Sequence, residues 1–168
     1  MGFRVGMTYN VKSEFPLQPG DPPDLNAEFD HEDTIAHIER ALRSGGHEVV
    51  RLGNARTLLE RVKPLAVDIV FNIAEGYEGR NRESQVPILL EMLRIPCVGA
   101  DGLTLGLTLD KVLTKKLLIA EGIPTPPWQL FPTPVTPLNP ALAFPLIVKP
   151  NREGSGKGIW RESVVGDE

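Results

Sequence analysis

Residues 146–159 read LIVKPNREGSGKGI, a short aliphatic run followed by a glycine-rich loop. The run Leu146–Val148 predicts a buried strand, since short apolar runs are typical of strands covered by other elements. Three glycines then lie within five residues: Gly154, Gly156 and Gly158. Glycine accepts positive φ and lets backbone N–H groups approach an anion closely. Together with two cations, Lys149 and Lys157, and the hydroxyl of Ser155, these glycines make a loop that could cover a polyphosphate.

The loop departs from two familiar nucleotide-binding motifs. A Walker A loop requires Ser or Thr after its Gly-Lys pair, but Gly158 follows Gly156-Lys157, and Asn151 stands where its first glycine should be. A dinucleotide-binding fingerprint would need glycine at the position of Ile159. The residues alone leave open an alternative, a glycine-rich hairpin turn with two solvated lysines.

The composition indicates a globular protein of one domain or one and a half. The chain has 168 residues, of which 41% are hydrophobic, so a packed core is feasible. A net charge of −4 argues against a general nucleic-acid binder. The single cysteine, Cys97, excludes an internal disulfide, and the histidines have no metal-ligand spacing. Because we find neither a signal peptide nor a run of about 18 apolar residues, we expect a cytoplasmic protein without a membrane span.

Apolar periodicity predicts alternating strands and helices in the N-terminal part of the chain. The expected strands are 3–9, 48–52, 67–72 and 95–98, and the expected helices are 33–44, 55–62 and 84–93. This alternation predicts an α/β fold with a mostly parallel sheet. Residues 10–30 contain four prolines and no helix or strand period, so they predict a long exposed loop, either functional or merely mobile.

The loop after the third expected strand, residues 73–83, is the candidate substrate site. In open α/β sheets, ligands bind beyond the carboxyl ends of the strands, and this loop has that position. Its charged side chains Arg80, Arg82 and Glu83 could meet a zwitterion. A solvated loop is the alternative.

The C-terminal part predicts one long helix, 103–121, followed by a proline-rich segment. Gly122 has the position of a residue that ends a helix in the left-handed conformation. Eight prolines between residues 124 and 145 exclude another long helix. We expect one extended strand near residues 128–131 and one helical turn near residues 138–143.

Five motifs occur in one order along the chain: NIAEGYEGRNRESQVP (72–87), IPCVGAD (95–101), LDKVLTK (109–115), GIPTPP (122–127) and FPLIVKPNREGSG (144–156). Together they resemble the D-alanine–D-alanine ligase family of ATP-grasp enzymes, over roughly residues 3–160. The resemblance implies a doubly wound pre-ATP-grasp domain over residues 1–102 and the beginning of an ATP-grasp domain over residues 103–168. It also implies an ATP-dependent ligase that forms a C–N bond between amino acids.

The resemblance assigns roles to individual residues. The lysines that contact the ATP phosphates match Lys111 and Lys149. The loop that closes over the phosphates matches Glu153, Gly154, Ser155 and Gly156, with Ser155 as its catalytic hydroxyl. The positions that match or could replace substrate-binding residues are Glu14, Glu75, Arg80 and Glu83. ATP and Mg²⁺ are the implied cofactors.

Several departures from the family pattern bear on specificity. Ala74-Glu75-Gly76 stands where the family has His-Gly, and Gly156 replaces a second serine in the closing loop. A proline-rich loop replaces the short glycine-rich turn after the first strand, with Glu14 as a stand-in for its glutamate. These changes call into question whether D-alanine is the substrate.

The family's adenine-binding strand and magnesium ligands match nothing in this chain. We therefore expect no metal ligand here, and we expect the chain by itself to be incomplete and inactive. The alternative is a non-catalytic α/β module that binds a nucleotide or a protein. The expected partners are small amino acids, without nucleic acid or membrane, and a homodimer is compatible with the resemblance.

Overall fold

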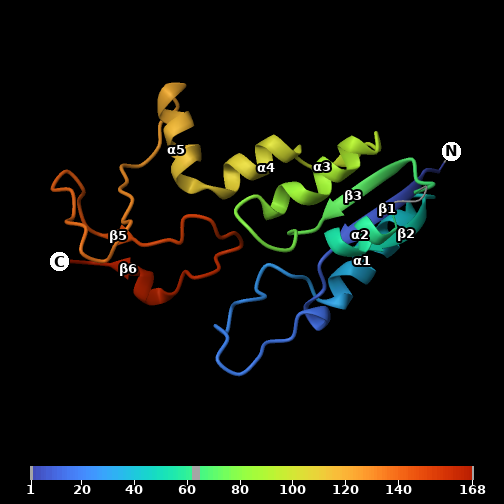
Figure 1. The fold of residues 1–168 in the computed structure, drawn as a ribbon, viewed down its shortest axis with the longest axis horizontal. Helices are drawn as coiled ribbons and strands as arrows, with labels where there is room; N and C mark the ends of the chain where they lie inside the picture. Colours follow the sequence, from blue (N-terminus) through green and yellow to red (C-terminus); the bar gives the residue numbers. More distant parts are fainter. Residues whose placement is uncertain (1, 62–64, 168) are drawn as a thin grey trace. The chain divides into compact units, whose positions relative to one another are not determined.

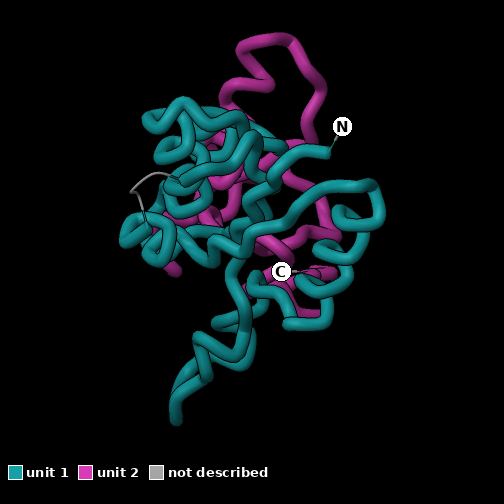
Figure 2. Tube along the Cα trace, turned by 90° about the vertical axis from the view of Figure 1, so that its right-hand side faces the viewer, with its two compact units in different colours: residues 1–106 teal, residues 107–168 magenta. Residues whose placement is uncertain are grey.

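The computed structural model describes residues 2–61 and 65–167, and the chain divides into two compact units, residues 1–106 and residues 107–168 (Figures 1 and 2). The division falls inside helix α4 (Gly102–Leu109). The domain boundary expected from the sequence, between residues 102 and 103, falls at the start of the same helix. No helix in the described part of the chain is long and apolar enough to cross a membrane.

Unit 1 is built on a sheet of four parallel strands: β1 (Arg4–Tyr9), β2 (Glu48–Gly53), β3 (Ile69–Ile73) and β4 (Cys97–Val98). The strand order is β2-β1-β3-β4, so β1 is an interior strand. Val5 on β1 pairs with Val49 on one side and with Ile69 on the other. The predicted α/β class with a mostly parallel sheet is confirmed.

Helices cover both faces of this sheet. Successive residues of a strand point to opposite faces, so each strand contributes side chains to both cores. On one face, Met7 and Val49 pack against Ile35 of α1 (Glu32–Ser44). On the other face, Leu52 and Val70 belong to a second core cluster that includes residues of α2 (Ala55–Glu60) and α3 (Gln85–Met92). These two clusters make unit 1 a doubly wound layer structure.

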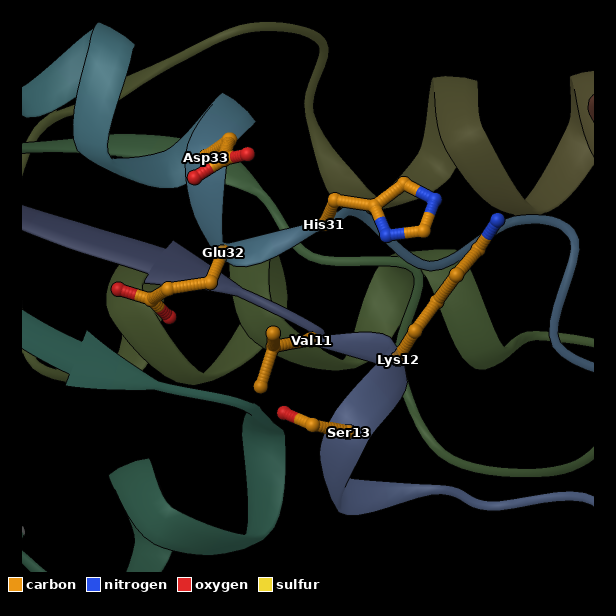
Figure 3. A pocket seen from close by; sticks show the side chains of 6 residues that line it. All are labelled: Val11, Lys12, Ser13, His31, Glu32 and Asp33. Atoms are coloured by element: carbon orange, nitrogen blue, oxygen red, sulfur yellow. The ribbon is translucent and has the colours of Figure 1, made fainter.

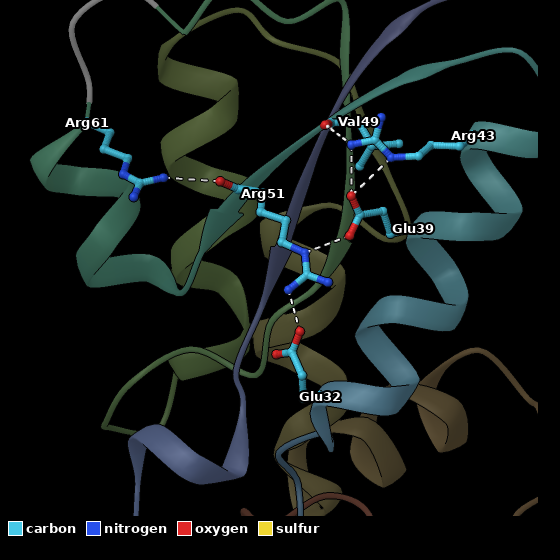
Figure 4. Close-up of polar contacts among 6 residues, drawn as sticks. All are labelled: Glu32, Glu39, Arg43, Val49, Arg51 and Arg61. Carbon is cyan, nitrogen blue, oxygen red and sulfur yellow. Dashed lines mark hydrogen bonds and ion pairs between the residues drawn. The ribbon is translucent and has the colours of Figure 1, made fainter.

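A group of charged side chains joins α1 to β2 (Figure 4). Arg51 on β2 donates from Nε to Glu39 at 2.7 Å and also pairs with Glu32. Arg43 donates to the other carboxylate oxygen of Glu39 at 2.8 Å and to the backbone oxygen of Val49 at 3.1 Å. Hydrogen bonds from Arg43 and then Arg51 hold the pKa of Glu39 below its usual range. The helix is thereby tied to its strand at three positions along its length.

The loop formed by residues 10–30 is less exposed than the sequence predicts. The N–H of Lys12 donates to the backbone oxygen of Asp30, and the N–H of Asp30 donates to that of Asn10, each at 2.9 Å. The rings of Phe15 and Phe29 lie 4.6 Å apart. The predicted exposed loop is confirmed for most of residues 13–27, whereas backbone pairing and ring packing hold its two ends together.

The other elements of unit 1 lie close to their predicted positions. The structure shortens the third strand to Ile69–Ile73 and the fourth to Cys97–Val98. Helix α2 ends at Glu60, and the last residue predicted for it, position 62, lies outside the described residues.

In unit 2, the long helix predicted over residues 103–121 is wrong, because it is broken in two. Helix α5 (Lys111–Ala120) begins after Asp110, whose backbone is extended with φ −88° and ψ 98°. The side chain of Asp110 caps α5 by accepting a hydrogen bond from the N–H of Leu113 at 3.1 Å. Aspartate competes well for helix N–H groups, so it favours a new helix start over continuation. Gly122 follows α5 with φ +70°, as predicted.

The rest of unit 2 has little regular structure. Residues 123–145 form turns and extended backbone, so neither the strand near 128–131 nor the helical turn near 138–143 forms. The strand β5 (Leu146–Ile147) pairs antiparallel with β6 (Val164–Val165). The strand predicted over residues 146–148 is confirmed over Leu146–Ile147, but its predicted burial is wrong, since Ile147 and Val148 are exposed.

Two adjacent leucines of α2 provide a test of the core of unit 1. Leu58 is fully buried in the cluster beneath β2, whereas Leu59 is 61% exposed. We expect Leu58→Ala to lower the free energy of unfolding by about 2–5 kcal/mol, because it leaves a cavity. Leu59→Ala should change it by less than about 1 kcal/mol. Urea denaturation of the two variants measures the difference, and equal losses would contradict this placement of α2.

Candidate functional site

The carboxyl ends of β1 and β3 bring two loops together in unit 1. Asn10, which follows β1 and is 1% exposed, donates from Nδ2 to the backbone oxygen of Gly76 at 3.0 Å. Its Oδ1 accepts the N–H of Glu75 at 2.9 Å. The ring of Phe15 lies 6.4 Å from that of Tyr77, between the same two loops. The amide of Asn10 therefore fixes the backbone at Glu75, the residue that stands in the candidate substrate loop.

Three carboxylates gather at this junction: Glu28, Glu75 and Glu83, with one oxygen from each lying within 4.8 Å of the others. Arg82, in the 3-10 turn Arg82–Ser84, donates to Glu28 at 2.6 Å, and both side chains are almost enclosed. The cluster therefore combines three carboxylates with one buried guanidinium, and carboxylates are groups that favour a cation or ammonium group nearby. Glu28 comes from the 10–30 loop and the other members come from the loop after β3.

The ionisation of Glu75 is shifted strongly. The pKa of Glu75 is raised to about 7, mainly by burial and also by the nearby carboxylates of Glu83 and Glu28, against the opposing effect of Arg82. Close to neutral pH this carboxyl is therefore divided between its neutral and charged forms. Perturbed groups of this kind are typical of functional sites, although structural clusters also produce them.

The remaining predicted substrate residues lie apart from this cluster or at its edge. Glu14 is exposed and accepts a hydrogen bond from Nδ2 of Asn54, the residue that caps α2, at 3.0 Å. Arg80 is exposed in the loop after β3. Of the four positions proposed from the sequence, the structure thus brings together Glu75 and Glu83, and it adds Glu28 to them.

A hollow of about 260 Å³ lies at the start of α1 (Figure 3). The ammonium group of Lys12 and the ring of His31 lie on one side of it, and the carboxylate of Glu32 points the other way. The remaining lining residues are Val11, Ser13 and Asp33. Its six lining residues include none of the predicted site residues, so we do not assign the function to this hollow.

In unit 2, the glycine-rich loop consists of two consecutive tight turns. The N–H of Lys157 donates to the backbone oxygen of Gly154 at 2.9 Å, and the N–H of Ile159 donates to that of Gly156 at 3.0 Å. The central residues Ser155 and Gly156 have φ of 49° and 75°. Positive φ at both central positions is the geometry of mirror-image turns, which serine adopts with strain and glycine without it. The loop also joins the antiparallel strands β5 and β6, so the hairpin alternative describes its connectivity correctly.

The predicted phosphate-binding lysines take different positions around this loop. Nζ of Lys111, in the first turn of α5, donates to the backbone oxygen of Glu153 at the base of the loop. The carboxylate of Glu153 pairs with Lys157 at 3.1 Å. Lys149 is exposed directly after β5. Lys111 is therefore attached to the loop, whereas Lys149 lies at its entrance.

The sequence analysis missed three residues that organise these sites, namely Asn10, Asp110 and Asn151. Asn151 was weighed only as a glycine missing from a Walker motif. Asn10 and Asn151 act on backbone segments about 40 or more residues away, namely Gly76 and helix α5, whereas Asp110 caps Leu113 locally. The Asp-Lys pair of the 109–115 motif was the one local signal, because Asp is a preferred helix cap.

Comparisons with known proteins identify the class to which this arrangement belongs. A D-alanine–D-alanine ligase of Methylococcus capsulatus is 38% identical over 130 residues, which are 76% of this chain and 41% of the relative. A crystal structure of D-alanine–D-alanine ligase from Bacillus anthracis matches 99% of this chain and 50% of its own, with 29% identity and a TM-score of 0.69. The structure of that ligase complexed with ATP matches with a TM-score of 0.64 and 27% identity. None of the family models compared with the chain matches it.

These likenesses show an α/β fold shared with D-alanine–D-alanine ligases. In both sequence and fold, the chain corresponds to the N-terminal half of D-alanine–D-alanine ligases. The chain spans about 40% of the length of the curated relatives and half of the solved ligase chains. The resemblance drawn from the five motifs is confirmed, while the roles of single residues stay predictions.

Two glycines of the loop after β3 offer a matched test of its backbone. Gly76 and Gly79 both have positive φ, so alanine is strained by about 1–2 kcal/mol at either position. A Cβ at Gly76 would lie 1.9 Å from the backbone oxygen of Arg82, whereas one at Gly79 meets nothing within 4 Å. We expect Gly76→Ala to destabilise the protein by about 1–3 kcal/mol more than Gly79→Ala in thermal unfolding. Equal losses would show that the loop relaxes without cost.

The raised pKa of Glu75 predicts a pH dependence of stability. The folded protein holds this proton more tightly than the unfolded chain, whose carboxyl has an ordinary pKa of 4.5. The penalty from Glu75 is therefore absent below about pH 4.5, grows as the pH rises, and is complete above about pH 7. Glu75→Gln should remove it, so the variant should gain stability relative to the parent across this window.

The measurement is the free energy of unfolding between pH 4 and pH 8, with Glu91→Gln, an exposed carboxylate on α3, as the control. A constant difference between Glu75→Gln and the parent at every pH would contradict the raised pKa.

Proposed function

We propose that this chain supplies the phosphate-binding and amino-acid-binding parts of an ATP-dependent ligase that joins a carboxylate to an amine. The observation that carries the proposal is the loop 153–158, whose left-handed turns lie against the lysine-bearing start of α5. The likeness to D-alanine–D-alanine ligases, one of them solved with ATP, supports the same nucleotide here. Since the chain spans only part of those proteins, the activity of the whole enzyme belongs to the proposal.

On the nucleotide side, Lys149 and the N–H groups of residues 154–156 bind the phosphates of ATP. Transfer of a phosphoryl group depends mainly on positioning and on neutralising charge, which cations and oriented N–H groups provide. The Ser155 hydroxyl donates to the same phosphate oxygens. Lys111 holds the base of the loop through Glu153 and reaches the phosphates from there.

On the amino-acid side, the cluster of Glu75, Glu83 and Glu28 recognises the ammonium group of a substrate. A cation placed between these carboxylates would favour the charged form of Glu75, so binding near neutral pH would release a proton. Ala74-Glu75-Gly76, in place of the family's His-Gly, presents a carboxylate where the family presents an imidazole. The substrate class is therefore a small amino acid whose amino group is bound by carboxylates, and we do not assign it to D-alanine.

In this proposal Mg²⁺ binds together with ATP, to which it is normally bound. When bound with ATP, Mg²⁺ would neutralise part of the phosphate charge. In the loop of unit 2, the carboxylate of Glu153 is engaged by Lys157, so we assign no magnesium ligand to this loop. A cytoplasmic location, a role in cell-wall peptide synthesis and a homodimer complete the proposal.

The test of the proposal compares two lysines of unit 2. Lys149 lies at the entrance of the loop, whereas Lys116 is exposed on α5. We expect Lys149→Ala to weaken ATP binding by about tenfold or more, because a hydrogen bond to a charged group contributes about 1.5–3 kcal/mol. Lys116→Ala should leave the affinity unchanged.

Isothermal titration with ATP at low salt measures both affinities, because the phosphate contacts are screened as ionic strength rises. Similar losses for Lys149→Ala and Lys116→Ala would mean that ATP binds through general charge and would overturn the proposed site.

A further inference from the structure

The residues at the base of the glycine-rich loop are bonded to the first turn of α5. The backbone oxygen of Asn151 accepts the N–H of Lys111 at 3.0 Å, and its side-chain Oδ1 accepts the N–H of Val112 at 2.9 Å. Its Nδ2 donates to Oδ1 of Asp110 at 3.0 Å. Arg152 donates from Nε to the second oxygen of Asp110 at 3.1 Å. Two adjacent residues of the loop thus engage the helix start from which they are separated by some 40 positions.

These contacts satisfy the first three N–H groups of α5, which have no partner within the helix itself. Asn151 takes the first two, and Asp110 takes that of Leu113. The helix start is consequently occupied by protein groups and does not serve as the phosphate site. The start of α5 instead holds the loop at a fixed distance from Lys111.

The amide of Asn151 can serve this purpose in one orientation. Its oxygen faces an N–H donor, and its nitrogen faces a carboxylate acceptor, so a flipped amide would lose both bonds. Asp110 is 3% exposed; burial alone would raise its pKa, but hydrogen bonds from Leu113, Asn151 and Arg152 outweigh that effect and keep it lowered. A charged acceptor therefore faces the amide throughout the neutral range, and charge-assisted bonds are the stronger ones.

We propose that Asn151 is a positioning residue of the phosphate site, because it joins the helix turn that carries Lys111 to the loop that carries Ser155. This role rests on the proposed function, in which ATP binds at the loop. Nζ of Lys111 reaches the backbone oxygen of Glu153, two residues beyond Asn151, so the lysine and the loop share one anchor. Without the anchor, the loop and Lys111 could still each bind phosphate, but they would no longer be held in register.

The first experiment needs no ligand. Asn151→Ala removes the bonds to Val112 and Asp110 but leaves the backbone oxygen and the Asp110 cap in place, so unit 2 should stay folded. We expect the amine of Lys111 to react several-fold faster with an acylating reagent in this variant, as measured by mass spectrometry of its peptide. Asn139→Ala, which removes an asparagine bonded to Ala141 in the same unit, is the matched control and should leave the rate unchanged.

The second experiment measures ATP affinity by titration. Asn151→Ala should weaken binding by about tenfold, and Asn151→Asp should weaken it at least as much, because it sets a second carboxylate against Asp110. The double variant Asp110→Asn/Asn151→Ala should lose less affinity than the two single losses combined, because both substitutions disrupt the same bond. Losses that arise independently would instead multiply.

The outcomes of these experiments distinguish the proposed function from the positioning role of Asn151. An unsubstituted protein that does not bind ATP would overturn the proposed function and this role together. ATP binding that Asn151→Ala leaves unchanged, or single losses that simply multiply in the double variant, would overturn the positioning role alone. Reduced affinity with faster labelling of Lys111, and a double variant that loses less than the two single losses combined, is the result expected.

Discussion

The interior position of β1 is the constraint on which unit 1 depends. Because β1 pairs in parallel with both β2 and β3, their carboxyl ends lie at one edge of the sheet, and the chain that leaves β1 meets the chain that leaves β3. Gly6 shows how close this packing is, since a Cβ there would lie 2.6 Å from Leu52. The buried amide of Asn10 then completes the contact by bonding the loop at Glu75 and Gly76. The carboxylate cluster is the consequence of that meeting, which no segment of the chain could form alone.

The two units reach order by different means. In unit 1, two apolar clusters lie on opposite faces of a sheet, and charged groups reinforce them from outside. In the described part of unit 2, Leu109 is the apolar residue that is buried. The geometry around the loop is fixed by hydrogen bonds that involve Asp110, Asn151 and Lys111. Polar networks fix geometry when every member is satisfied, whereas cores fix it through volume. The phosphate site that we propose for unit 2 depends on the geometry that such a polar network fixes.

The sequence was a good guide where local patterns decide structure and a poor one where distant partners do. Alternating apolar positions predicted the strands and helices of unit 1 to within a few residues, and the five motifs led to the correct family. The break between α4 and α5 was missed, because apolar spacing continues through Asp110 and its partner Asn151 is 41 residues away. Glu28 was missed for the same reason, since its burial depends on Arg82. The exposure of Ile147 and Val148 could not be read from composition, which measures apolar character but not what covers it.

The near enclosure of the ion pair between Glu28 and Arg82 sets it apart from other charged contacts of unit 1. The side chains of Glu28 and Arg82 are 3% and 11% exposed, whereas those of Arg4 and Glu48, paired at the start of β1 and β2, are 45% and 62% exposed. Dissolved ions screen charges that water surrounds and act much less on those that it does not reach. Rising ionic strength should therefore weaken the exposed pair between β1 and β2 while the buried pair keeps its two loops together. A fold built in this way keeps the geometry of its carboxylate cluster as the salt concentration changes.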